Sequence, residues 1–454
     1  MFTYIELENF KSFEKIRFDF KKTKTSVKNF IALYGENGSG KSNFVSSIEL
    51  LSKMMMSYVR LGQWQELKKL IDGDKREYGQ LTRDVLESIP INELNDNLKN
   101  NLKKCRMIDC DKVTKVKYGF FIEGKEGYYS VSFDENSILE EELYYITNKQ
   151  RGQLYKIFMD GDTIIHKFSK SLFKSDKYSR YIVELIDMYW GKHSLLAILL
   201  GEIKDKNEKY IFNTISKHCL NVIDNLMNVF ILCKSSKSQT TTIIGSDIKI
   251  RDFEDVEIGV NNADKKKQLD IIEKIIDDFF TQVYTDIVKV YYKPVSSRQE
   301  NVIRYKLFVE KIIAGKVRVI PFELESAGTQ RVLYILRAII EAVNGQTVIY
   351  DEIDNGIHDL LMRNILMSVQ DDITGQLIIT THNTLLLEDL DPKSAYVIYV
   401  DSEGYKEARC FYDYDIRIQG SNNQRRLYLN GVFGGIPYSS QIDCTNMHIN
   451  NEEE

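Results

Sequence analysis

The residues best suited to chemistry lie between positions 35 and 42. Gly35, Gly40, Lys41 and Ser42 match the spacing G-x-x-x-x-G-K-[ST], in which a glycine-rich loop turns backbone N–H groups toward bound phosphate. Lys41 would bring a positive charge to the β- and γ-phosphates, and the Ser42 hydroxyl would be a ligand for Mg²⁺. The spacing therefore predicts a site for ATP and Mg²⁺. The candidate nucleotide-binding residues of this loop are Gly35, Asn37, Gly38, Ser39, Gly40, Lys41, Ser42 and Asn43.

A second group of candidate residues follows two apolar runs much later in the sequence. The run T-V-I-Y is followed by Asp351 and Glu352, and the run L-I-I-T-T is followed by His382. A carboxylate at the end of a buried strand can hold Mg²⁺, which is the role predicted for Asp351, while Glu352 can polarise the attacking water as a general base. The carboxyl ends of parallel strands meet at one sheet edge, so His382 is expected at the same place. Glu352, His382 and Lys41 are the candidate catalytic residues for slow, Mg²⁺-dependent hydrolysis of ATP.

Hydrophobic patterns indicate the strands and helices that must position these residues. Phe30 to Tyr34 is typical of a buried strand, and the apolar positions after Lys41 predict a helix to about Tyr58. Residues 2–20 alternate apolar and polar side chains twice, which predicts two antiparallel strands. After residue 300, strand and helix patterns alternate. The elements expected there are strands within 303–324 turning at Gly315, helix 326–344, strand 347–351, helix 356–370, strand 377–381, helix 383–389 and strand 396–400.

The middle of the chain has a different pattern. Residues 61–106 are polar and mostly helical, with a loop expected near Ile89 and Pro90. Strand-like runs fill 113–147, with a hairpin turn at 124–127, and helical periodicity dominates from about 168 to 290. No heptad pattern persists over several turns, which argues against a long coiled coil. We therefore expect one compact, mainly helical insertion.

Composition excludes several classes of protein. The net charge of −5 over 454 residues gives no global basic field for nucleic acid, so direct binding of DNA or RNA would need a local patch. Lysines within 11–28 are either a solvated strand face or such a patch. The six cysteines form no C-x-x-C pair, which indicates reduced thiols in a cytoplasmic protein. No apolar run reaches the roughly 18 to 20 residues of a membrane span, so no membrane partner is expected.

Five sequence motifs resemble those of the ABC-type ATPases of the SMC/RecF/OLD group. These motifs are N-F-K-S-F, G-E-N-G-S-G-K-S, E-S-A-G-T-Q-R, V-I-Y-D-E-I-D and I-I-T-T-H-N. The resemblance implies that Ser326, Ala327 and Gly328 open a signature helix that contacts the γ-phosphate bound to a second protomer. It also implies that the loop at Asp354 crosses the dimer interface and that His382 senses the γ-phosphate. The implied assembly is at least a head-to-tail dimer, and several dimers could join into a larger ring.

A narrower resemblance is to bacterial abortive-infection ATPases of the AbiL-like kind. The signature variant E-S-A-G-T-Q, the run S-L-L-A-I-L-L and the late Y-L-N-G-V-F-G-G-I-P are similar to the ATPase subunits of two-gene phage-defence systems such as PARIS (AriA) and Septu (PtuA). No Toprim-like acidic cluster or HNH pattern follows residue 437. The resemblance therefore implies a separate Toprim or HNH nuclease as effector, a phage-derived trigger protein, and a bacterial cytoplasmic location.

These observations predict an α/β fold, a P-loop NTPase of ABC-ATPase type with an N-terminal antiparallel β-subdomain and an inserted helical lobe. The expected layout is the N-terminal half of the ATPase at 1–150, the helical lobe at 151–300, the C-terminal half at 301–437 and a disordered tail at 438–454. Two functions remain open. The chain is either a sensor and scaffold ATPase of an abortive-infection system or a RecF-like or SMC-like repair ATPase acting directly on DNA.

Overall fold

The fold is known from a computed structural model of the chain. It describes residues 1–72, 98–146, 152–232, 253–260, 262–295, 302–414 and 423–437. The loop expected near Ile89 and Pro90 and the tail at 438–454 lie outside these ranges. Within them, no helix combines the length and the apolar character needed to cross a membrane.

The centre of the fold is a six-stranded sheet in the order β11-β16-β17-β5-β18-β19. The first five strands are parallel, and β19 pairs antiparallel with β18. Their bounds are Val229–Leu232 for β11, Thr347–Tyr350 for β16, Gln376–Thr380 for β17, Phe30–Tyr34 for β5, Ala395–Val400 for β18 and Lys406–Cys410 for β19. Every residue of β5 and β17 is buried, as continuous apolar runs in a parallel sheet predict.

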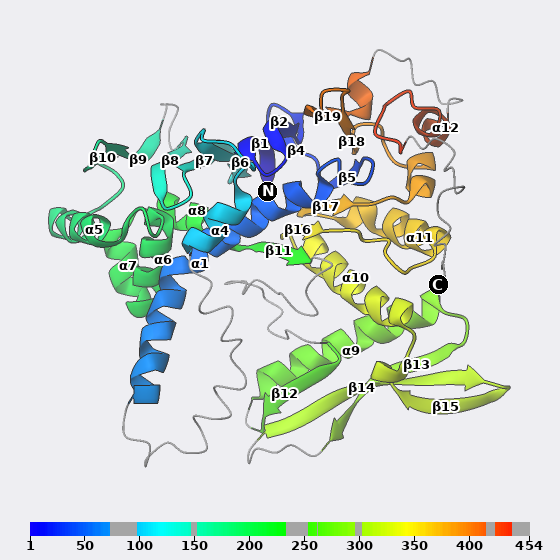
Figure 1. Ribbon diagram of the computed structural model, residues 1–454. Helices are drawn as coiled ribbons and strands as arrows, with labels where there is room; N and C mark the ends of the chain where they lie inside the picture. The colour runs from blue at the N-terminus through cyan, green and yellow to red at the C-terminus, as the bar shows by residue number, and fades with distance from the viewer. Residues whose placement is uncertain are drawn as a thin grey trace, which may run out of the picture.

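Alternate side chains of β5 pack on opposite faces of this sheet. Ile31 and Leu33 join a core with α1 (Lys41–Asp72), whereas Phe30, Ala32 and Tyr34 join a core on the other side. The second core includes α10 (Ala327–Val343) and α11 (Asp359–Val369). The central sheet is therefore sandwiched between two apolar layers, and the helix that begins at Lys41 lies in one of them (Figure 1).

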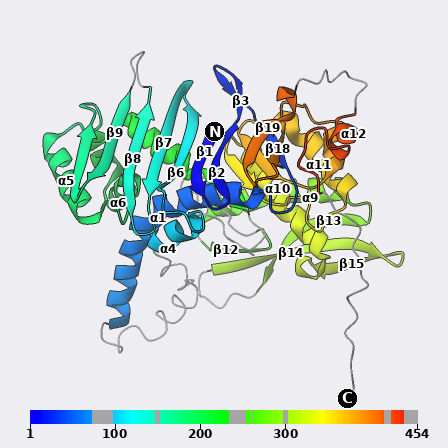
Figure 2. The same ribbon diagram turned by 45° about the horizontal axis from the view of Figure 1, so that its top comes forward.

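A seven-stranded antiparallel sheet lies beside α1, in the order β10-β9-β8-β7-β6-β1-β2 (Figures 1 and 2). Strands β1 and β2 form the hairpin predicted for residues 2–20, and β6 and β7 turn at Glu123 and Gly124, one residue before the predicted turn. The strands are β1 (Phe2–Phe10), β2 (Phe13–Asp19), β6 (Thr114–Ile122), β7 (Lys125–Phe133), β8 (Ile138–Tyr145), β9 (Gln153–Asp160) and β10 (Thr163–Phe168). A short hairpin, β3 (Lys21–Thr23) with β4 (Ser26–Val27), leads into β5.

The expectation of a single helical lobe over 151–300 needs correction. The helices in this part of the chain are α5 (Asp176–Tyr189), α6 (Leu195–Asp205), α7 (Glu208–Thr214), α8 (Lys217–Met227) and α9 (Ala263–Val283). However, β9 and β10 extend the seven-stranded sheet, and β11 is an edge strand of the central sheet. Short apolar runs such as V-F-I-L suit a buried strand or a helix equally well, and here tertiary pairing decides for the strand.

Helix α9 covers a third sheet, called here the accessory sheet. It consists of β12 (Asp255–Gly259), β13 (Ile287–Val295), β14 (Val302–Ile313) and β15 (Lys316–Pro321). The predicted turn at Gly315 joins β14 to β15. Figure 1 shows α10 running from this sheet toward the central one. The accessory sheet therefore draws strands from both sides of the boundary expected at residue 300.

Several element boundaries differ from the predicted ones. Helix α1 continues from Lys41 to Asp72 instead of ending near Tyr58, and α11 begins at Asp359 instead of residue 356. The helix predicted over 383–389 is a 3-10 helix, η3 (Thr384–Glu388). The short helix α4 (Leu98–Cys105) packs on α1, and η1 (Phe322–Leu324) precedes α10.

A buried carboxylate joins the seven-stranded sheet to α6. Glu141 of β8 is 0 % exposed and accepts hydrogen bonds from groups on β7, β9 and α6 and from Trp190, the C-cap of α5. The donors are the Tyr129 and Tyr155 hydroxyls at 3.0 and 2.8 Å, the Trp190 Nε1–H at 2.8 Å and the backbone N–H groups of Leu195 and Leu196 at 2.7 and 3.4 Å. Burial raises the pKa of Glu141, and these donors oppose the rise. Since α6 packs on α1, the helix that follows the phosphate loop, the hydrogen bonds of Glu141 to α6 help to position α1.

Glu141→Leu is expected to lower the free energy of unfolding by roughly 3–5 kcal/mol, because the buried donors lose their shared acceptor. Chemical denaturation monitored by circular dichroism measures the change. Glu142→Gln is the matched control, since Glu142 is half-exposed and bonds Gln153 at 2.6 Å. Equal stabilities of the two variants would show that the Glu141 cluster contributes little.

His193 gives the fold a pH dependence. Its Nδ1 lies 2.9 Å from Ser57 Oγ of α1, and burial lowers the pKa of His193 from 6.5 to about 4. The unfolded chain binds this proton below its ordinary pKa and the folded chain only near pH 4, so stability falls as pH drops from about 6.5 to about 4. The loss has an upper limit of about 3 kcal/mol. In thermal melts across this range, His193→Gln should lose less stability than the wild type; parallel profiles would exclude this role.

Candidate active site

The phosphate loop lies at the carboxyl end of β5, where the chain turns into α1. Gly35, Gly38 and Gly40 have φ angles of 148°, 82° and 115°, a region that favours glycine. Space is restricted at Gly40, where a Cβ would lie 2.5 Å from the Phe13 ring. The loop conformation thus needs glycine at 40 for two reasons, and Phe13 from the predicted N-terminal hairpin supports it.

Lys41 is held inside the loop. Its Nζ donates to the carbonyl oxygens of Gly35 at 2.6 Å and Glu36 at 3.1 Å, and the residue is only 7 % exposed. Burial lowers the pKa of Lys41, while the charges of Asp351 and Glu352 act in the opposite direction. The ammonium group therefore lies close enough to the acidic strand end, 310 positions away in the sequence, for its pKa to be affected by those carboxylates.

The loop residues fit a phosphate group. The first N–H groups of α1 have no intrahelical acceptor, and the positive end of the helix dipole adds to them. The Ser39 hydroxyl is buried and has no hydrogen-bond partner among the described atoms. An anion with several acceptor oxygens would satisfy these donors together with Lys41.

Ser42 and Asp351, the two predicted Mg²⁺ ligands, are in contact. Asp351 is 8 % exposed, and its burial raises the pKa of the carboxyl group, a rise opposed by hydrogen bonds from Thr380 and Ser42. No group of three or more His, Cys, Asp or Glu side chains gathers as a metal cage in the described ranges. One carboxylate and one hydroxyl suit Mg²⁺, which takes its remaining ligands from phosphates and water.

Glu352 follows in a left-handed conformation with φ of 50°. Its backbone N–H donates to Thr380 Oγ1 at 2.7 Å, and the Asn355 Nδ2 donates to its Oε2 at 3.2 Å. The Thr380 hydroxyl also donates to Asp351 Oδ1 at 2.6 Å. Thr380, at the end of β17, therefore joins the two carboxylate residues, and the sequence analysis did not single it out.

Thr380→Val should reduce hydrolysis about tenfold and raise the Mg²⁺ concentration needed for half-maximal rate, because Asp351 loses its donor. Thr380→Ser keeps the hydroxyl and is expected to restore both quantities. Titration of hydrolysis against Mg²⁺, with direct Mn²⁺ binding as a second readout, measures the effect. A Val variant with the wild-type Mg²⁺ profile would contradict this role of Thr380.

His382 lies at the predicted edge, directly beyond β17, and is exposed. Its backbone N–H donates to Asp354 Oδ2 at 3.0 Å, while Asp354 Oδ1 is buried without a partner among the described residues. The structure thus brings His382 and Asp354 together on the loops after the two neighbouring strands β17 and β16.

The signature residues begin α10. Ser326 is the N-cap, and its Oγ accepts from the Thr329 backbone N–H at 3.1 Å and lies 2.9 Å from the Thr329 hydroxyl oxygen. Ala327 is the first helical residue. Gly328 passes close to the acidic loop, because a Cβ there would lie 2.9 Å from the Gly356 carbonyl oxygen. In the described part of the chain, no hydrogen bond joins Ser326 to the loop at 35–43.

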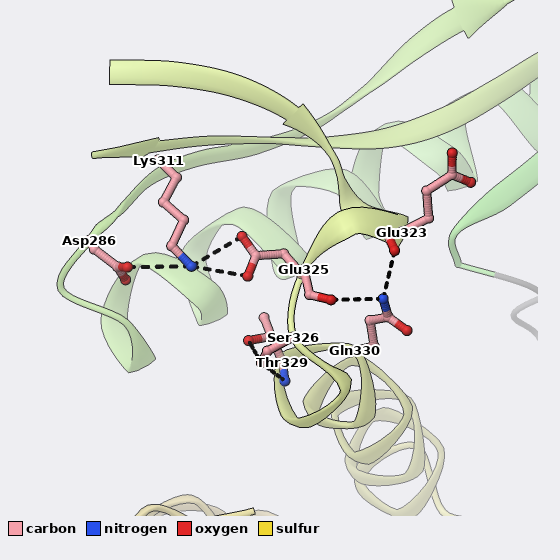
Figure 3. Close-up of polar contacts among 7 residues, drawn as sticks. All are labelled: Asp286, Lys311, Glu323, Glu325, Ser326, Thr329 and Gln330. Atoms are coloured by element: carbon pink, nitrogen blue, oxygen red, sulfur yellow. Dashed lines mark hydrogen bonds and ion pairs between the residues drawn. The ribbon is translucent and has the colours of Figure 1, made fainter. Parts of the chain in front are cut away.

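The segment before Ser326 is held from two sides (Figure 3). Lys311 of β14 donates to both carboxylate oxygens of Glu325, at 3.2 and 3.0 Å, and also pairs with Asp286 at 3.3 Å. From α10, the Gln330 Nε2 donates to the carbonyl oxygens of Glu323 and Glu325 at 2.9 and 3.0 Å. The accessory sheet and α10 therefore position the signature serine together.

Lys406 of β19 is another residue that sequence reasoning missed. Its Nζ donates to the Gly38 carbonyl oxygen at 2.8 Å and to Ser12 Oγ at 2.7 Å, and Ser12 also accepts from Asn43 Nδ2 at 2.7 Å. A lone lysine in an antiparallel strand has no signal in the sequence. Only the pairing of β19 with β18 brings it to the phosphate loop.

The match to a known family falls on the second half of the site. Residues 202–388 match the family described as "AAA domain, putative AbiEii toxin, Type IV TA system". The match covers less than half of the chain. The match includes Ser326, Asp351, Glu352 and His382. It does not include the loop at 35–42, which joins these residues in one site only when the chain folds. With the strand order β16-β17-β5, the predicted α/β P-loop ATPase fold with an antiparallel N-terminal subdomain is confirmed.

Solved structures of SMC heads are similar to this chain at low identity. An SmcHead bound to the C-winged helix domain of ScpA shares 15% identity at a TM-score of 0.44, covering 90% of this chain and 96% of that one. The SMC head domain from Thermotoga maritima shares 12% at 0.36, covering 90% and 98%. An Smc head with an extended coiled coil, bound to the C-terminal domain of ScpA derived from Pyrococcus furiosus, shares 14% at 0.38, covering 90% and 95%. The comparison with curated proteins finds no match.

Proposed function

We propose that this chain is an ABC-type, Mg²⁺-dependent ATPase that serves as the sensor and scaffold subunit of a bacterial anti-phage abortive-infection system. The observation that carries the ATPase activity is the meeting of Lys41, Ser42 and Asp351 at one edge of the central sheet. The abortive-infection role is supported by the AbiEii-like family match and by the resemblance of the motifs.

The chain's own residues divide the work of hydrolysis. The phosphate loop and Lys41 bind the nucleotide's phosphates, and Ser42 and Asp351 would hold Mg²⁺, which neutralises developing negative charge when bound. Glu352 orients the attacking water and accepts its proton, and the left-handed turn held by Thr380 directs that carboxylate. His382, which follows the neighbouring strand β17, contacts the γ-phosphate and so senses whether it is present.

The signature residues Ser326, Ala327 and Gly328 complete the site of a second copy in a head-to-tail dimer. Their position at the start of a long helix places N–H donors where a γ-phosphate could bind, and no hydrogen bond among the described residues joins Ser326 to the phosphate loop of the same chain. Hydrolysis then requires two copies, so we expect slow turnover by the isolated protein.

Mixing two inactive variants tests composite sites. Lys41→Ala and Ser326→Arg proteins are each expected to be inactive, whereas the mixture should recover hydrolysis from one intact site per heterodimer. Heterodimer formation is verified by native mass spectrometry of differently tagged chains. Heterodimers without recovered activity would exclude a site shared between copies.

ATP that bridges two copies binds the closed dimer better than the open monomers, so it shifts the protein toward the closed state. This change of conformation is the means by which ATP can act on an effector. We therefore expect a separate Toprim or HNH nuclease to dock on this subunit and a phage-derived protein to trigger its release or activation. Cells that carry this gene and the neighbouring gene for the effector should resist phage. Resistance should require both genes, and it should be lost when Lys41 or Glu352 is replaced. Protection by this chain alone, with nuclease activity in the purified protein, would overturn the two-component proposal.

The alternative of a RecF-like or SMC-like repair ATPase acting on DNA has less support. Three of the seven basic residues within 11–28, the segment that could face DNA, are paired with carboxylates. The pairs are Lys15 with Glu8, Arg17 with Glu6 and Asp19, and Lys21 with Glu126. This pairing favours the solvated-face interpretation. ATP-dependent binding of DNA or RNA that weakens steeply with salt would restore the alternative.

A further inference from the structure

The side chain of Glu352 is connected to the turn that follows it. Asn355 donates through Nδ2 to Glu352 Oε2 at 3.2 Å, and its backbone N–H donates to the Glu352 carbonyl oxygen at 3.1 Å. The orientation of the carboxylate therefore depends on where Asn355 lies.

Asn355 is in turn held by the signature helix. The Arg331 Nη1 of α10 donates to the Asn355 carbonyl oxygen. The guanidinium fills the space beside Gly356, whose φ is 74° and where a Cβ would lie 2.6 Å from Nη1. Gly328, one turn earlier on α10, faces the same loop, because a Cβ there would lie 2.9 Å from the Gly356 carbonyl oxygen. Helix and loop thus meet at two points, and a side chain at either glycine would push them apart.

The start of α10 is also bound to the accessory sheet, because Glu325, directly before the N-cap Ser326, pairs with Lys311 of β14. Glu325 has a side chain only 3% exposed, so this ion pair is shielded from solvent and holds a defined geometry. A continuous series of contacts therefore leads from β14 through Glu325, α10 and Arg331 to Asn355 and the catalytic carboxylate.

We propose that Arg331 is a positioning residue that makes the orientation of Glu352 depend on the position of α10. The inference rests on the proposed ATPase function and adds that the position of α10 regulates the rate of hydrolysis. When a second copy engages Ser326, or a partner moves the accessory sheet, a shift of the rigid helix moves Arg331, Asn355 and Glu352 together. Hydrolysis in the site of one chain thereby depends on whether the signature residues of that same chain have bound the γ-phosphate in the site of the second copy.

Arg331→Met keeps most of the apolar stem and removes the donor to Asn355. Its kcat should fall on the order of tenfold to a hundredfold, with KM and the Kd for a fluorescent ATP analogue within about twofold of wild type. Arg331→Lys should recover much of the rate, because an ammonium group can still donate to the carbonyl oxygen. Arg363→Met is the control, since Arg363 lies on α11 and pairs with Asp389 and Glu388.

Amide hydrogen exchange supplies a readout independent of turnover. The amides of residues 353–357 should exchange faster in Arg331→Met than in Arg331→Lys, while those of β16 and β17 stay unchanged. Wild-type kcat and wild-type exchange in Arg331→Met would overturn the inference. Absence of ATP binding and hydrolysis in the wild-type protein would instead overturn the proposed function, so the two failures are distinct.

Discussion

Replacing Glu352 with glutamine is expected to abolish ATP hydrolysis and to leave ATP binding intact. The amide keeps the shape and the hydrogen bond from Asn355, but it cannot accept a proton, so kcat should fall by about a hundredfold to ten-thousandfold. Because the γ-phosphate then persists, the variant should accumulate as an ATP-bound dimer. Phosphate release and size-exclusion chromatography with light scattering measure the two effects.

Glu403→Gln is the matched control, since Glu403 is exposed in the turn before β19. It should hydrolyse ATP at the wild-type rate and show no ATP-dependent dimer beyond that of the wild type. Wild-type hydrolysis by Glu352→Gln would show that another group is the general base, and Asp354 on the same loop would be the next candidate.

Replacing Lys41 with alanine is expected to remove nucleotide binding. The ammonium group is buried in the loop and donates to two backbone carbonyl oxygens there. It is therefore already positioned in the loop before a phosphate binds. Loss of one charged hydrogen-bonding group weakens binding by about a hundredfold. Isothermal titration with ATP and Mg²⁺ measures the loss, and the ATP-dependent rise in melting temperature should vanish with it.

Lys53→Ala, on the same helix and half-exposed, controls for helix stability and net charge. It should bind ATP as the wild type does. If Lys41→Ala bound ATP with wild-type affinity, the nucleotide would have to lie elsewhere, and the loop at 35–42 would have a structural role only.

The catalytic edge could be predicted from sequence because each of its parts is a short contiguous motif. The glycines before Lys41 require a loop, and an apolar run before Asp351 requires a buried strand. Their meeting followed from the rule that parallel strands place their carboxyl ends together. The roles assigned to Glu352, His382 and the signature residues are still predictions.

The supporting contacts could not be predicted in this way. Thr380, Arg331 and Lys311 act through residues far away in sequence, so no local pattern distinguishes them from ordinary residues of a strand or helix. Strand β11 was missed for a related reason: four apolar residues after a helix acquire a strand partner only when β16 is present. The helical lobe was likewise expected as one body because periodicity does not reveal which sheet a short strand joins.

The strand order β16-β17-β5 also determines when during synthesis this protein can acquire its site. The seven-stranded sheet consists of the β1–β2 hairpin and the consecutive strands β6 to β10, joined by the pairing of β1 with β6, so it can form once roughly the first 170 residues have emerged. Strand β5 must wait for β17 and β18, which are made more than 340 residues later. We therefore expect nascent chains to expose the apolar faces of β5 and α1 for much of translation and to depend on chaperones there. ATP binding would then be a late event that stabilises only fully synthesised chains.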